Sequence, residues 1–96
     1  MRLTYLEKPR AGALFHLSIV DAEGSVRTTW SVDGEPVETT ECDDPPCYEE
    51  MYIQSDWQGR RLDILSVDSQ ETKRLSFIIA GTDMAPVANV GAAQLG

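Results

Sequence analysis

Short stretches of alternating apolar and polar residues, separated by turn residues, run through most of this chain. Such alternation places successive side chains on opposite faces of an extended strand, and little of the sequence repeats at the 3.6-residue interval of a helix. The pattern predicts seven strands, over Arg2–Glu7, Ala13–Val20, Val26–Val32, Glu35–Glu41, Tyr48–Gln54, Arg61–Val67 and Arg74–Ala80. We therefore expect an all-β fold, a small antiparallel sandwich or open barrel of about six to seven strands.

The tetrapeptide Val32-Asp33-Gly34-Glu35 is the clearest turn, because Asp-Gly fits the two left-handed positions of a type I′ hairpin turn. In that register Trp30 faces Val37 on the neighbouring strand. A second predicted hairpin, around the loop Asp21–Gly24, places Phe15 opposite Trp30. Together the two registers send one apolar set to a common face: Phe15, Leu17, Ile19, Val26, Trp30, Val32 and Val37. A slip of one residue in either hairpin would scatter this set.

Pro36 indicates where the predicted strand Glu35–Glu41 lies in its sheet. In a two-residue hairpin the missing N–H of Pro36 points away from the partner strand, so no further strand can pair fully on that side. This predicts an edge strand. Its two later acidic residues, Glu38 and Glu41, would also discourage uncontrolled pairing with other chains, which is a purely structural explanation for their charge.

The last two predicted strands form another regular hairpin. Pairing Val67 with Arg74 sets Leu62 opposite Ile79 and produces a second apolar face. Two hairpins with two apolar faces are typical of a sandwich or a small barrel.

The segment Tyr48–Gln54 has two interpretations. Asp44 followed by Pro45, with acidic residues close behind, resembles the start of a short helix. We favour a strand, because the residues from Gln54 to Gly59 look like a hairpin loop that leads back to Arg61.

The charge of the chain is concentrated in its middle third. Its 96 residues include 16 acidic and 8 basic residues, for a formal net charge of −8. No Lys or Arg lies between Arg27 and Arg60, an interval that holds Asp33, Glu35, Glu38, Glu41, Asp43, Asp44, Glu49, Glu50 and Asp56. Direct binding to nucleic acid is disfavoured, because contacts to phosphates need Lys and Arg. An acidic face serves solubility or steers a basic partner.

The residue types that carry catalysis or bind metals are few. Cys42 and Cys47 could close a disulfide across Asp43-Asp44-Pro45-Pro46, but we favour two reduced thiols, as expected of a cytoplasmic protein. A zinc site would need two more ligands, and His16, the one histidine, is predicted to face solvent. No nucleophile elbow or phosphate-binding glycine loop is present. We therefore expect no enzyme, no cofactor and no metal.

These observations favour a non-catalytic acidic interaction protein. We expect an inhibitor or immunity-type protein, of bacterial or phage kind, that mimics nucleic acid and covers a basic surface of a nuclease or nucleic-acid-binding partner. The candidate contact residues are acidic side chains for steering and aromatic ones for anchoring. They are Glu35, Glu38, Glu41, Asp43, Asp44, Tyr48, Glu49, Glu50, Tyr52 and Trp57. The alternative is an assembly subunit that forms homo-oligomers through edge strands and its C-terminal tail.

The ends of the chain complete these expectations. Residues 1–80 are predicted to form a single antiparallel β domain, and residues 81–96 an Ala/Gly/Val-rich tail that packs on that domain or binds a partner. The sequence contains no apolar stretch of the roughly 18 residues that a membrane helix requires. We expect a cytoplasmic protein with no membrane partner.

Overall fold

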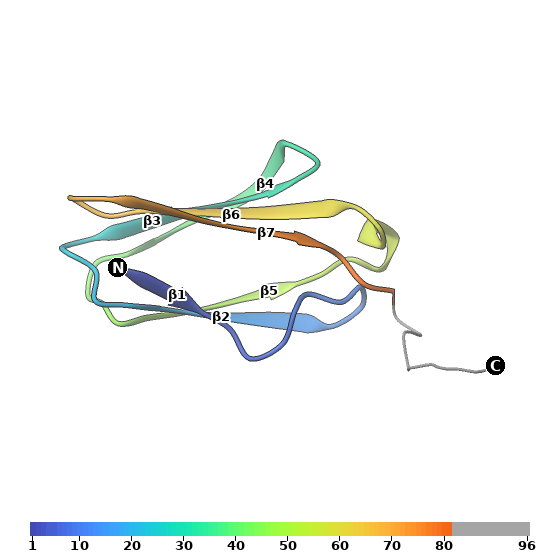
Figure 1. Ribbon diagram of the computed structural model, residues 1–96, viewed down its shortest axis with the longest axis horizontal. Helices are drawn as coiled ribbons and strands as arrows, with labels where there is room; N and C mark the ends of the chain where they lie inside the picture. The colour runs from blue at the N-terminus through green and yellow to red at the C-terminus, as the bar shows by residue number, and fades with distance from the viewer. Residues whose placement is uncertain (82–96) are drawn as a thin grey trace.

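The computed structural model describes residues 1–81, and in it two antiparallel sheets pack face to face as a β-sandwich (Figure 1). One sheet has the strand order β1-β2-β5, and the other the order β4-β3-β6-β7. The strands are β1 (Arg2–Thr4), β2 (Leu14–Val20), β3 (Val26–Val32), β4 (Glu35–Cys42), β5 (Cys47–Tyr52), β6 (Arg61–Val67) and β7 (Thr72–Ile78). The predicted all-β antiparallel fold is confirmed, and of the two architectures left open it is the sandwich and not the open barrel.

The chain crosses between the sheets three times, after β2, β4 and β5 (Figure 1). The fifth strand thereby returns beside the second and the sixth beside the third, which is Greek-key connectivity. The segment predicted over Tyr48–Gln54, for which a helix was the alternative, is a strand that spans Cys47–Tyr52. The described residues contain one helical element, a single 3₁₀ turn named η1 (Ser55–Trp57). In residues 1–81 no helix is long and apolar enough to cross a membrane. Except for Gly81, the predicted tail of residues 81–96 lies outside the described residues.

The predicted pairing of β2 with β3 is wrong. The two strands belong to opposite sheets, and β2 pairs instead with β1 and β5. Phe15 and Trp30 do meet, but across the core, where their ring centroids are 6.0 Å apart at an interplanar angle of 81°. Alternation determines which side chains are buried, and it does so equally for two strands in one sheet and two strands in facing sheets.

The β3–β4 hairpin has a bulge that the predicted register lacks. Ser31 pairs with Pro36 but Trp30 pairs with Glu38, so Val37 is an extra residue without a partner. Beyond this point the register moves by one residue. Val37, predicted in the core, is 43% exposed. The prediction that β4 is an edge strand is confirmed.

The β6–β7 hairpin is shorter than predicted. Val67 pairs with Thr72 rather than Arg74, and Leu62 pairs with Phe77 rather than Ile79. The carboxylate of Asp68 closes this tight turn by accepting hydrogen bonds from the backbone N–H groups of the residues two and three positions later, at 2.8 and 2.7 Å. A side chain that bonds to its own turn makes a four-residue loop favourable.

The core between the sheets consists mainly of aliphatic and aromatic side chains. Trp30, at its centre, is 1% exposed. One row of hydroxyl groups crosses the inner face of the larger sheet, because Thr28 pairs with Thr40 on one side and Ser66 on the other. The buried hydroxyls of Thr28 and Ser66 are hydrogen-bonded at 2.9 Å, whereas the Thr40 hydroxyl oxygen is buried with no partner among the described residues.

Candidate functional site

The edge strands β4 and β5 lie on the same side of the sandwich. They are the outer strands of their respective sheets, and a disulfide between Cys42 and Cys47 joins the end of one to the start of the other. The expectation of two reduced thiols is therefore wrong. The loop between the strands contains a cis Pro45-Pro46 peptide, and the two cysteine Cα atoms are 6.2 Å apart, within bonding range of a disulfide.

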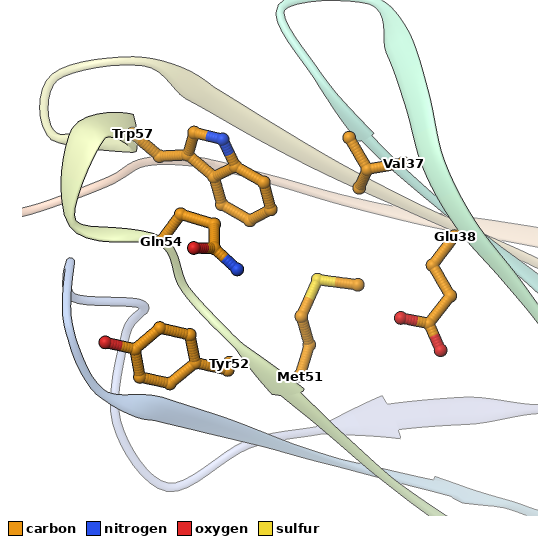
Figure 2. Close-up of a pocket in the computed structure, with 6 residues that line it drawn as sticks. All are labelled: Val37, Glu38, Met51, Tyr52, Gln54 and Trp57. Atoms are coloured by element: carbon orange, nitrogen blue, oxygen red, sulfur yellow. The ribbon is translucent and has the colours of Figure 1, made fainter.

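A pocket of about 300 Å³ opens between these two edges (Figure 2). Its lining residues come from both sheets and from η1: Val37, Glu38, Met51, Tyr52, Gln54 and Trp57. We call it the edge pocket. Figure 2 shows Glu38 and Met51 pointing toward one another from β4 and β5, with the indole of Trp57 on the opposite wall.

Local structure explains how a glutamate comes to line this pocket. The bulge at Val37 turns Glu38 to the face that Trp30 occupies on the neighbouring strand, which is the inner face of the sheet. On an edge strand that face is only partly covered, so the carboxylate remains exposed. Met51 faces inward from β5 and is buried, and the 3₁₀ turn holds Trp57 half-buried against the core.

Three acidic residues of the middle third lie within ion-pair distance of a basic side chain, and the contact of Glu50 is an ion pair only when His16 is protonated. Asp33 lies 2.8 Å from Arg60, Glu41 lies 3.1 Å from Arg27, and Glu50 lies 3.4 Å from His16. Five of the candidate residues form no ion pair within residues 1–81, namely Glu35, Glu38, Asp43, Asp44 and Glu49. We call these five the acidic edge, because all lie on β4, on β5 or in the loop between them.

The hairpin carboxylate Asp33 has a structural part. Its pKa is lowered by the hydrogen bond from the backbone N–H of Arg61 and by that from the Arg60 side chain. These bonds, at 3.0 and 2.8 Å, tie the β3–β4 turn to the start of β6. Asp33 therefore helps to position the hairpin that carries Glu38.

The candidate contact residues do not form one surface. Glu38, Tyr52 and Trp57 meet at the edge pocket. Glu49 is half-buried on the inner face of β5, whereas Tyr48 and Glu50 project outward from that strand. The remaining four are all exposed: Glu35, Glu41, Asp43 and Asp44.

A second exposed region covers the outer face of the smaller sheet. Tyr48 is 75% exposed there and Tyr52 is 49% exposed. Between them the cross-strand pair of His16 and Glu50 occupies the middle of the face. The prediction that His16 faces outward is confirmed.

Comparison with protein-family models, with curated proteins and with solved structures finds no match for this chain. A fold of this kind supports many unrelated functions, so the fold alone assigns no activity. Among residues 1–81 no group of three or more His, Cys, Asp or Glu side chains is arranged to hold a metal ion.

Sequence reasoning missed half of the edge pocket. Val37 and Met51 have the apolar character of core residues, and Gln54 has the character of a loop residue. Their common position depends on the bulge in β4 and on how the two sheets face each other. Pro36, which marks β4 as an edge strand, and the acidic stretch that contains Glu38 are the sequence signals near this site.

Proposed function

We propose that this protein is a non-catalytic binding module that covers a basic surface of a protein partner, in the manner of an inhibitor or immunity-type protein. The observation that carries the proposal is the acidic edge: five carboxylates without a cationic partner in residues 1–81, beside two exposed tyrosines on β5. Unpaired carboxylates attract a positively charged surface and repel nucleic acid.

The two exposed tyrosines are expected to supply binding affinity. Charge complementarity mainly raises the association rate and selects the partner, whereas buried aromatic side chains contribute most of the affinity. Tyr48 and Tyr52 stand next to the acidic edge and are accessible to a partner. A basic surface that approaches β4 and β5 would meet charge first and the phenol rings on contact.

Capture of a partner from native lysate tests the proposal with two charge-matched variants. The first removes three acids of the acidic edge, by Glu35→Gln, Glu38→Gln and Asp44→Asn. The control removes three exposed acids elsewhere, by Glu7→Gln, Asp21→Asn and Glu23→Gln. We expect the wild type and the control to retain a basic protein at about 0.05 M salt and to release it at about 0.5 M, because salt screens exposed charges.

The acidic-edge variant is expected to retain little of that protein at either salt concentration. Recovery of no basic protein by the wild type at low salt would contradict the proposal. Equal loss by both variants would show that net charge matters and that its position does not.

Homo-oligomerisation is the second candidate function, favoured by β5, an edge strand of the smaller sheet that contains no proline. Exposed strand edges can pair with a second copy. Sedimentation of the full chain and of a chain that ends at Gly81 separates the alternatives. A monomer in both cases removes this function, and a dimer only in the full chain assigns it to the tail.

The cytoplasmic location stays a prediction, and the disulfide bears on it. Disulfides persist mainly in oxidising compartments. Thiol labelling of the protein from freshly lysed cells measures the state of Cys42 and Cys47 directly. Two labelled thiols would agree with a cytoplasmic protein, and a protected bridge would favour an oxidising location.

A further inference from the structure

We infer that the edge pocket receives a single arginine side chain, which the partner inserts between β4 and β5. This inference rests on the proposed function and adds to it the group that the acidic side recognises. It is carried by one carboxylate, Glu38, in a pocket whose lining also includes apolar, aromatic and amide side chains.

The size of the pocket suits one side chain. Sites that enclose small-molecule ligands span roughly 300–1,000 Å³, and the edge pocket, at about 300 Å³, lies at the lower limit of that range. Val37, Met51 and Trp57 offer apolar surface for an aliphatic stem (Figure 2). Long basic side chains bury such a stem while their charged end stays near polar groups.

The charge of the occupant follows from Glu38. Its carboxylate forms no ion pair within residues 1–81, and it points into the space between the strands (Figure 2). A neutral or acidic occupant would lower the hydration of this carboxylate without offering a counter-charge, which is unfavourable. A cationic group restores hydrogen bonding and neutralises it.

The remaining polar and aromatic groups favour arginine over lysine. A guanidinium group is planar, so it can stack on the indole of Trp57 while its N–H groups reach a carboxylate and an amide oxygen. Glu38 and Gln54 offer those two acceptors on the pocket lining. An ammonium group carries the same charge but has no flat face to stack.

The inference is tested by titration of ¹⁵N-labelled full-length protein with N-acetyl-arginine amide. The two indole N–H signals make the experiment internally controlled, since Trp57 lines the pocket and Trp30 is buried in the core. We expect the Trp57 signal to shift in a saturable way while the Trp30 signal stays in place. N-acetyl-citrulline amide, a neutral analogue of nearly the same shape, is expected to shift neither.

Comparison of two variants shows whether Glu38 is the anion that binds the probe. Glu38→Gln is expected to weaken binding about 5-fold, the size of a partly exposed ion pair. Glu35→Gln removes the same charge from the same strand outside the pocket, and it should leave the affinity within about 2-fold of the wild type. Both residues are exposed, so neither change is expected to disturb folding.

Three results would overturn the inference. They are an unshifted Trp57 signal at saturating probe, an equal response to the citrulline analogue, and tighter binding of N-acetyl-lysine amide than of the arginine probe. The outcome is independent of partner capture. A basic partner retained by the acidic edge together with an unshifted Trp57 signal would leave the proposed function intact and remove the arginine pocket.

Discussion

Removal of one hydroxyl from the buried row is predicted to cost more than removal of two. Thr28 and Ser66 hydrogen-bond to each other at 2.9 Å inside the core, on neighbouring strands of the larger sheet. Thr28→Val leaves the Ser66 hydroxyl buried without this partner, and Ser66→Ala does the same to Thr28. A buried polar group without a partner costs about 1–3 kcal/mol, whereas replacing both partners with apolar groups is nearly neutral.

The two single variants and the double variant form a double-mutant cycle, and each has an expected change in the free energy of unfolding. Each single variant is expected to lower the free energy of unfolding by about 2 kcal/mol. The double variant Thr28→Val/Ser66→Ala is expected to lie within about 1 kcal/mol of the wild type. The two substitutions are thus coupled by about 3 kcal/mol, at the upper end of what residues in direct contact show.

The third member of the row provides a contrast. The Thr40 hydroxyl oxygen is buried and has no partner among the described residues. Thr40→Val replaces that hydroxyl with a methyl group of similar size and breaks no hydrogen bond of the Thr28–Ser66 pair. The free energy of unfolding of this variant is expected to be about 1 kcal/mol higher than that of the wild type, because the cost of burying the unpaired oxygen disappears.

Equilibrium unfolding in urea, followed by tryptophan fluorescence, measures all five proteins. The slope of the transition should be the same in each, so that differences in midpoint report stability alone. Additive effects of the Thr28 and Ser66 substitutions within about 0.5 kcal/mol would refute the reasoning. A destabilised Thr40→Val protein would show that the hydroxyl is satisfied in solution.

Two further perturbations are predicted from local structure. Replacing Cys42 and Cys47 with alanine opens a loop of about six residues and should lower the free energy of unfolding by about 2 kcal/mol in urea; equal stability would show that the loop does not constrain the unfolded chain. Asp68 has a pKa lowered from 3.8 by hydrogen bonds from backbone N–H groups, that of Glu23 foremost. The free energy of unfolding should therefore stay constant between about pH 7 and pH 5 and decline as the pH falls below 3.8 toward the folded-state pKa of Asp68. In Asp68→Asn this decline should be less steep. An equally steep decline in that variant would contradict the prediction.

Most strands were predictable because they have an alternation of their own, whereas Tyr48–Gln54 was assigned from the hairpin-like loop that follows it. Val26–Val32 and Arg61–Val67 have the bounds expected from the sequence, and the other five differ by a few residues at their ends. Pro36 also identified an edge strand correctly. These features depend on the face that each residue presents and on the hydrogen bonds that proline lacks, and both are local properties.

Pairing between strands was not predictable in the same way. Phe15 and Trp30 are buried whether their strands are neighbours in one sheet or face each other across the core, so the pattern could not separate the two arrangements. The bulge at Val37 likewise leaves no mark in the alternation of β4. Asp68 shortened the last hairpin by bonding to its own turn, which moved that register by two residues.

The same limits explain what was expected of the functional surface. The absence of Lys and Arg between Arg27 and Arg60 drew attention to residues near both edge strands. These residues included Glu38, Tyr52 and Trp57 of the edge pocket. It could not indicate which acids are neutralised, because Arg27 reaches Glu41 from the neighbouring strand and Arg60 reaches Asp33 from the residue before β6. Composition records how many charges a segment has, and pairing decides which of them are available.

The edge pocket is divided between the two sheets, and this has a thermodynamic consequence. Val37 and Glu38 belong to one layer of the sandwich and Met51 and Tyr52 to the other, so an occupant touches both at once. The site exists only while the layers are packed together, and mass action then links occupancy to the melting temperature of the protein. A thermal-shift screen of short peptides would therefore register any ligand of this site, whatever its chemistry, before a natural partner has been isolated.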